Sequence, residues 1–316
     1  MTQAKGARAK VVIDFESVYN TDPETPAGKI LNINSSNLSG SQSLNTAGTI
    51  RGNRNPAEPF RGNTSVGGAT VVPVDLIGIG YILKALFGAP TTTNASADYT
   101  HVFKPGDEQP SLVVEQQFPD IGVYAKYNGC KASRFSISVG GDGELTASLD
   151  WLGAKETISS SAYDESATAI ALVRFGNFQA SLEEGGSLLA IATSVDLTID
   201  MGLDGDTYVI GGQGFRGAIN EGIIGISGTV RALFQNNTLL NKAVNGTPTS
   251  LKITFTKAAN KALEIFLPEV VYERKTPGIE GPRGILIELP FQAYYSSNGD
   301  NTAIKTTLKN QIASYA

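Results

Sequence analysis

The chain has 316 residues, of which 41% are hydrophobic and only 17% are charged. The charged fraction lies below the ~25% usual in soluble domains, and the hydrophobic content excludes a largely disordered chain. A formal net charge of −5 gives no basic surface of the kind a nucleic-acid-binding protein needs. The single Cys130 excludes an internal disulfide framework. The single His101 excludes sites built from several histidines.

The first ten residues are basic but lead into no apolar segment, so no secretion signal is predicted. The most apolar window, 71–87, contains Pro73, Asp75 and Lys84. It is too short to span a bilayer, which needs ~20 mostly apolar residues. We therefore expect a soluble protein that is made in a cytoplasm and has no membrane partner.

Period-two alternation of apolar and polar residues predicts a mainly β protein. Each such segment places apolar side chains on one face and Ser, Thr or charged side chains on the other, as in an antiparallel sheet with one solvated face. The glycine-rich segment 140–143 predicts a hairpin turn. In chain order, the expected strands are 11–15, 30–34, 111–115, 135–139, 145–151, 195–199, 251–255, 263–268 and 285–289.

Two helices are predicted by apolar residues at helical spacing between a start and a stop signal. The first is expected at 75–88, where Asp75 can cap the N-terminus and Gly88 can end the helix. Glycines inside this helix cost ~1 kcal/mol each relative to alanine, and close packing against a sheet would explain them. The second is expected at 238–244 and is ended by Gly246.

A third helix is predicted at 302–314, close to the C-terminus. Its basis is that Ile304, Leu308 and Ile312 recur at every fourth position and would form one apolar stripe. This helix would flank the second half of the chain, as the helix at 75–88 flanks the first.

The order of the expected elements repeats in the two halves of the chain. In each half, two strands and a long loop precede a helix that ends at Gly-x-Pro, and a strand beginning with Ser-Leu follows. The first half carries an insertion after its helix, at about 91–109. Two copies of one module explain this order, so we expect modules at 1–160 and 170–316, joined by a Ser- and Ala-rich linker at 157–169. Two like modules can stand for two subunits of a ring.

Each half also contains a long loop rich in Gly, Asn and Arg, at 38–68 and 202–221. Loops longer than ~12–15 residues without structure of their own are uncommon and usually functional. One interpretation is a mobile surface loop. The other is an arm that becomes ordered against a neighbouring subunit, since Arg and aromatic residues are enriched at interfaces. Its contact residues would be Arg51, Arg54, Phe60, Arg61, Phe215 and Arg216.

The sequence shows no pattern of catalytic residues. Asp14 and Glu16 share a strand face, but glycoside hydrolysis by paired carboxylates needs a sugar cleft that nothing else indicates. Residues 204–206 lack the remaining ligands of an EF-hand loop. His101 is expected to be structural, and Cys130 to be a small buried residue. We expect no enzymatic activity, no cofactor and no metal.

The helix at 75–88 and five further sequences follow one another as they do in a known family. These sequences are Tyr-Thr-His-Val-Phe at 99–103, Gln-Pro-Ser-Leu at 109–112, Tyr-Asn-Gly-Cys-Lys at 127–131, Leu-Gly-Ala-Lys at 152–155 and Leu-Glu-Ile-Phe-Leu-Pro at 263–268. In these features the chain resembles the tail tube, or major tail, proteins of long-tailed bacteriophages. It is most similar to the subfamily of about this chain length with a duplicated tube module.

The resemblance implies a β-sandwich-like or barrel-like module with a flanking helix. Six modules form a ring, and stacked rings form a conduit for genome ejection. With two modules in each chain, three chains would complete the ring, so a homotrimer is favoured over a hexamer. The implied partners are further copies of the chain and the tape-measure, tail terminator and distal tail proteins, with DNA only in transit. The implied location is the virion tail, after synthesis in the host cytoplasm.

The polar strand faces would then line the channel. A lysine-rich wall would hold DNA through counterion release, whereas an acidic or neutral wall lets it slide. The expected lumen-lining acids are Asp14, Glu16, Asp150, Asp196, Asp200 and Glu288.

Two alternatives remain at this stage. A virion-associated carbohydrate-binding or depolymerase β-sandwich would need a cleft with convergent aromatic and acidic residues, yet the single Trp151 lies in a core alternation. A bacterial surface or pilus-like subunit would need the secretion signal that the N-terminal sequence does not predict.

Overall fold

About half of the chain (49%) forms β-strands, which make an open sheet rather than a closed barrel. The computed structural model describes residues 3–279, 281–297 and 299–315, and this part holds two α-helices, α1 (Gly78–Phe87) and α2 (Thr238–Asn245). The mainly β prediction is confirmed, but the barrel-like closure is not present. The strands are β1 (Lys10–Phe15), β2 (Lys29–Leu31), β3 (Ser35–Ser36), β4 (Ser39–Asn45), β5 (Phe60–Pro73), β6 (Thr91–Ala95), β7 (Asp98–Phe103), β8 (Leu112–Phe118), β9 (Val123–Val139), β10 (Thr146–Gly153), β11 (Lys155–Ser159), β12 (Thr168–Ala169), β13 (Ala180–Glu184), β14 (Ser187–Leu188), β15 (Ala192–Asp200), β16 (Gly225–Leu233), β17 (Thr249–Ala258), β18 (Lys261–Tyr272), β19 (Leu286–Ala293) and β20 (Lys305–Asn310).

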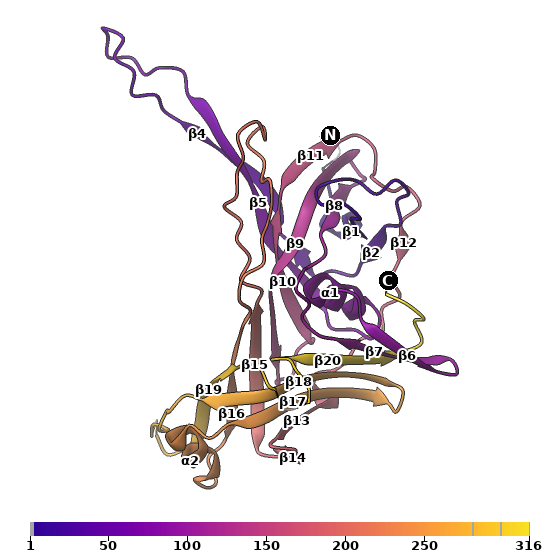
Figure 1. Ribbon diagram of the computed structural model, residues 1–316, viewed down its shortest axis with the longest axis vertical. Coiled ribbons are helices and arrows are strands. Elements are labelled where there is room, and N and C mark those ends of the chain that lie inside the picture. Colours follow the sequence, from indigo (N-terminus) through magenta and orange to yellow (C-terminus); the bar gives the residue numbers. More distant parts are fainter. Residues whose placement is uncertain (1–2, 280, 298, 316) are drawn as a thin grey trace.

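Strand β9 belongs to two layers of the molecule (Figure 1). Its first part pairs with β8 and β11, and β1, β2 and β12 extend this first layer beyond β8. Its second part pairs with β10 on one side and β15 on the other. Since β5 lies beyond β10, and β16 and β19 lie beyond β15, a second layer runs in the order β5–β10–β9–β15–β16–β19.

Strand β18 joins this second layer to a third group of strands. Its last residues, 270–272, pair with β19, whereas earlier residues pair with β17 and β20. Beyond β17 lie β13 and β14, and beyond β20 lie β7 and β6. The antiparallel pairings β13–β17–β18–β19–β16 in the second half therefore follow the same order as β1–β8–β9–β10–β5 in the first.

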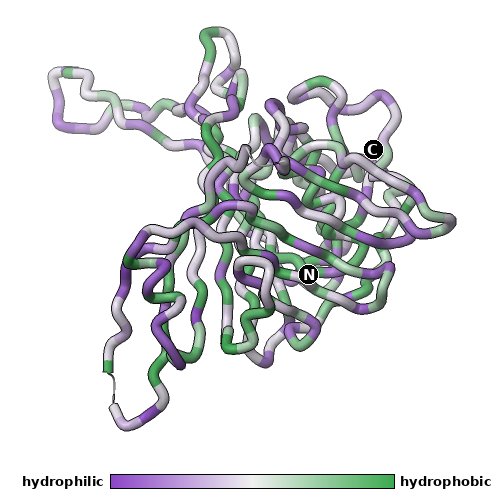
Figure 2. The backbone as a smooth tube through the Cα atoms, turned by 60° about the horizontal axis from the view of Figure 1, so that its bottom comes forward, coloured by the Kyte–Doolittle hydropathy of each residue, from purple (hydrophilic) through white to green (hydrophobic). Residues whose placement is uncertain are grey.

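The core lies on one face of the second layer, as the period-two pattern requires. Alternate residues of its strands, such as Phe135, Leu149 and Leu197, are buried, and α1 contacts β9. Figure 2 shows the resulting alternation of hydrophobic and hydrophilic residues along the strands. Trp151 belongs to this core: it is 2% exposed, and its indole N–H donates to Thr70 Oγ1 over 3.1 Å.

The Asp75 side chain caps helix α1 as predicted, although the helix begins at Gly78 and its N-cap position is occupied by Ile77. The Asp75 carboxylate accepts hydrogen bonds from the backbone N–H groups of Gly78 and Ile79, at 3.1 and 3.0 Å. These N–H groups belong to the first turn and therefore have no acceptor within the helix. At Gly80, any Cβ would overlap with the ring of Tyr315. Gly80 is therefore needed because Tyr315, near the C-terminus, packs closely against α1 at this position. The sequence had suggested a sheet as the packing partner of the helix glycines. Helix α2 is also present as predicted and ends at Gly246, whose φ is 60°.

The helix predicted at 302–314 is wrong, because this segment forms strand β20. Within it, Thr306, Leu308 and Asn310 are buried and alternate with more exposed residues, which is a period of two. Apolar residues four positions apart lie on one face of a helix and also on one face of a strand. The neighbouring Thr residues favour the strand. Strand β20 lies between β18 and β7, which decides the outcome.

His101 on β7 is buried beside β20 and is structural, as predicted. Its Nε2 lies 2.9 Å from the Ile312 carbonyl oxygen, which can only accept, so Nε2 donates. Nδ1 then accepts from the Thr92 hydroxyl, 2.8 Å away. In this arrangement the neutral ring is fully hydrogen-bonded, and burial lowers the pKa of His101 below its usual value of 6.5.

We expect this histidine to make the free subunit less stable at acidic pH. Because the folded pKa lies below the unfolded one, the unfolded chain binds the extra proton first. The stability contribution is complete above pH 6.5 and declines below it, by up to ~1.4 kcal/mol per pH unit for one proton. Urea unfolding at several pH values should show this slope, and His101→Gln should remove it whatever its effect at neutral pH. An unchanged slope in the variant would contradict the assignment.

The loop predicted at 38–68 is largely a hairpin of β4 and β5 that projects from the body (Figure 1). Within 39–68, only the residues between these two strands lack strand structure. The segment 202–221 is held by isolated bridges that join Asp204 to Asn220 and Tyr208 to Arg216. The two segments lie side by side, because Thr64 N–H donates to the Gly214 carbonyl over 2.8 Å.

The expected linker at 157–169 is attached to the first layer. Strand β11 enters it, and β12 pairs in parallel with β2. Between them, Tyr163 N–H donates to Glu115 over 2.8 Å, and Gly28 N–H donates to Asp164 over 2.9 Å. The segment therefore folds with the first half of the chain.

Candidate functional site

The outer face of the second layer carries polar side chains from five neighbouring strands. The same alternation that buries the apolar residues turns their neighbours outward. The set comprises six Ser or Thr residues, four acids, two arginines and one glutamine. They are Arg134, Ser136, Ser138, Ser148, Asp150, Asp196, Thr198, Asp200, Ser227, Thr229, Arg231, Glu288 and Gln292, and we call this set the polar face.

Arg134 on β9 links acids of the two adjacent strands. Its Nη2 lies 2.8 Å from Asp200 Oδ2 on β15, and its Nη1 lies 3.9 Å from Asp150 Oδ2 on β10. The hydrogen bond from Arg134 lowers the pKa of Asp200, and the Gly202 N–H adds to this effect. Asp200 therefore stays ionised over the whole physiological pH range.

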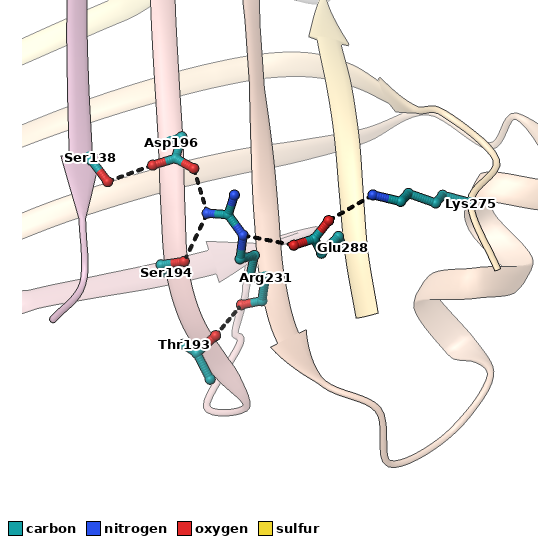
Figure 3. A network of polar contacts seen from close by, with 7 residues as sticks. All are labelled: Ser138, Thr193, Ser194, Asp196, Arg231, Lys275 and Glu288. Atoms are coloured by element: carbon teal, nitrogen blue, oxygen red, sulfur yellow. Dashed lines mark hydrogen bonds and ion pairs between the residues drawn. The ribbon is translucent and has the colours of Figure 1, made fainter. Parts of the chain in front are cut away.

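Arg231 on β16 forms the second group of ion pairs (Figure 3). Its guanidinium lies 2.6 Å from Asp196 on β15 and 3.1 Å from Glu288 on β19. Asp196 also accepts from Ser138 over 2.5 Å, and Glu288 accepts from Lys275 over 2.7 Å. The hydrogen bonds from Lys275 and Arg231 lower the pKa of Glu288.

Ion pairing reduces the acidity expected for this face. Asp150, Asp196, Asp200 and Glu288 contribute four negative charges, and the two arginines contribute two positive ones. Neither Arg134 nor Arg231 was among the residues predicted from the sequence for this face. They could have been found, because Arg134 and Arg231 occupy the same polar positions in the alternation as the acids.

Asp14 and Glu16 do not lie with the other four expected acids. Asp14 lies near the end of β1 in the first layer, and Glu16 follows directly after that strand. Asp14 is 9% exposed and accepts from Ala27 N–H over 2.8 Å and from the Tyr163 hydroxyl over 3.0 Å. Glu16 accepts from the Ser111 hydroxyl over 2.6 Å. Both carboxylates fasten loops to the first layer.

The expected contact residues divide into an exposed and a buried group. Arg51, Arg54, Phe60 and Arg61 are exposed on the β4–β5 hairpin. Arg216 is only 6% exposed, and its Nη1 donates to the carbonyls of Val66 and Gly153 over 2.9 and 2.7 Å. It also bonds to Gly205 and Ser65. The neighbouring Phe215 is half-buried. Arg216 thus fastens the 202–221 segment to β5 within the chain.

Within the described residues, no group of three or more His, Cys, Asp or Glu side chains could hold a metal ion. In the 204–206 segment, Asp204 accepts from the Asp206 N–H over 3.0 Å, which is a local turn. Burial raises the pKa of the Cys130 thiol, so it is unreactive at neutral pH. The part of the chain that the structure covers has no helix of sufficient length and apolar character to cross a membrane.

Comparison with known protein families gives a match that covers most of the chain. A search of curated protein sequences finds no match to this chain. The family model described as phage tail tube protein matches residues 6–293, which includes both layers and every residue of the polar face. The resemblance noted in the sequence is therefore confirmed: the chain belongs to the phage tail tube protein family, and it is a structural component of the virion tail.

Proposed function

We propose that the polar face lines the bore of the tail tube, through which DNA passes during genome ejection. The observation that carries this proposal is the second layer: a broad sheet with one apolar face in the core and one face of hydroxyl groups and ion pairs. Such a wall offers DNA no unpaired cations to bind. In this proposal Asp150, Asp196, Asp200 and Glu288 line the bore, whereas Asp14 and Glu16 do not.

We also propose that the chain holds two tube modules and forms a ring of three copies. The repeated pairing order of the two halves supports this, because each half supplies three neighbouring strands to the second layer, β5–β10–β9 and β15–β16–β19. Stacked rings would form the tube, and its ends would meet the tape-measure, terminator and distal tail proteins. Isolated rings should have a mass of about 100 kDa, three times 33.2 kDa. A ring of twice that mass would contradict the trimer.

Reversing the charge of the polar face should slow DNA without preventing assembly. Replacing Asp150, Asp196, Asp200 and Glu288 by Lys leaves both arginines unpaired and makes the wall basic. Attraction across the bore acts over about one Debye length, ~8–10 Å at physiological salt. We expect slower ejection from phage carrying this variant, with the largest effect at low ionic strength.

The matched control reverses four exposed acids in loops away from the polar face, Glu24, Asp107, Glu108 and Glu165. Both variants gain the same charge, so only position distinguishes them. Equal ejection rates for the two variants at low salt, with intact tubes, would contradict the lumen assignment.

A further inference from the structure

The junction between the two halves of the chain supplies a template for a junction between chains. Within the chain, the end of β9 pairs with β15, from Val139 with Val195 to Arg134 with Asp200. This pairing joins the last strand of the first half's unit, β4–β5–β10–β9, to the first strand of the second half's unit, β15–β16–β19–β18.

The end of β18 has the same position among the strands of the second half as the end of β9 has among those of the first half. Strand β9 has β8 along one edge, and β11 followed by β10 along the other. Strand β18 has β17 along one edge, and β20 followed by β19 along the other. Beyond β8, the first edge of β9 is occupied by β15. Beyond β17, the corresponding edge of β18 and of the exposed residues 273–276 has no strand partner in the described part of the chain.

Strands β3 and β4 have the same position beside β5 in the first half as β15 has beside β16 in the second half. They pair with β5 as β15 pairs with β16: Ser36 is opposite Thr70, and Val195 is opposite Val230. Leu38, between β3 and β4, and Leu197, in β15, are both buried. On the side away from β5, the Leu38 carbonyl and the Gly40 N–H meet only side chains, Tyr127 and Glu156, each at the long distance of 3.2 Å.

From this correspondence we infer that residues 273–276, directly after β18, pair with the β3–β4 edge of a second copy of the chain. The inference rests on the proposed ring. The inference adds to the proposed ring the two strand edges that meet between neighbouring chains. Each chain has one edge of each kind, so the contact is head-to-tail and closes when the rotation completes a turn. The second layers of neighbouring chains then form one continuous wall, as β9 and β15 do inside each chain.

Disulfide trapping tests the inference directly. In a Cys130→Ala background, Ser39→Cys is combined in turn with Glu273→Cys, Arg274→Cys, Lys275→Cys and Thr276→Cys. Rings are first confirmed by negative-stain microscopy and then oxidised. We expect at least one combination to give covalent dimers and trimers, and no larger species. The positive control is Ser136→Cys with Thr198→Cys, which are opposite each other in β9 and β15 and should crosslink within one chain.

The negative control joins Ser39→Cys with Glu165→Cys, an exposed residue of the first layer. Intact rings that give no crosslink at any of the four positions, or that crosslink equally with the Glu165 control, would overturn the edge assignment and leave the tube function standing. Failure of the unmodified chain to form rings or tubes would instead contradict the proposed function, and the edge assignment with it.

Discussion

Removing the tip of the β4–β5 hairpin should leave a folded subunit that cannot form tubes. Replacement of residues 46–59 by Asn-Gly would join β4 to β5 through a two-residue turn that suits a hairpin. The tip makes only local hydrogen bonds, such as that from Asn55 N–H to Asn53 Oδ1 at 2.9 Å, and Ile50 is 96% exposed. An exposed apolar residue beside two arginines, Arg51 and Arg54, is typical of a contact surface.

The measurement compares tube formation by electron microscopy with thermal unfolding of the free subunit. We expect an unchanged unfolding transition and a complete loss of long tubes. The single change Ile50→Ser serves as a milder variant and should raise the concentration needed for assembly. Tubes of normal length from the shortened hairpin would show that the tip is a solvated loop rather than an arm between rings.

The second large effect is expected at Arg216. Its guanidinium donates to the carbonyls of Val66, Gly153 and Gly205, so Arg216→Met leaves these acceptors without their donor. An unsatisfied buried polar group costs about 1–3 kcal/mol. We therefore expect a loss of about 3 kcal/mol or more in the free energy of unfolding.

The chain contains a matched control for this change. Arg61 has the same neighbours in sequence, Phe before it and Gly after it, but it is exposed on the hairpin. Arg61→Met should change the free energy of unfolding by less than about 0.5 kcal/mol. Both variants are best measured by urea unfolding in the chain with the shortened hairpin, where assembly does not interfere. Equal effects of the two substitutions would contradict the assigned role of Arg216.

Arg61 and Arg216 show which features of the structure could be predicted from the sequence and which could not. The local pattern Phe-Arg-Gly is identical at both sites, so no local signal separates an exposed arginine from a buried one. The difference arises from contacts between residues far apart in the chain, since Arg216 reaches strand β5. Alternation along single strands was sufficient to predict which strand residues face the core and which face away from it, but not that Asp14 and Glu16 belong to another layer than the other acids. Which strands lie side by side, and hence which acids meet which arginines, depends on pairing over long distances.

The same limit explains the error at the C-terminus and the success at α1. The cap at Asp75 and the stop at Gly88 act within a few residues, so that helix was predictable. At 302–314, the spacing of Ile304 and Leu308 was compatible with helix and strand alike. Pairing with β7, which is about two hundred residues away in the sequence, selected the strand.

Strand β20 also has a mechanical consequence. It contacts β7 from the first half and β18 from the second, and lies beyond the segment 6–293 that the family model matches. Among the named strands, the two halves of one chain are thus paired at two places, β9 with β15 and β20 with β7. The strand contact that we infer between chains repeats only the first of these two pairings. In a ring of three chains, stiff and compliant joints would alternate, so that a bending tail would hinge at three seams around its circumference rather than six.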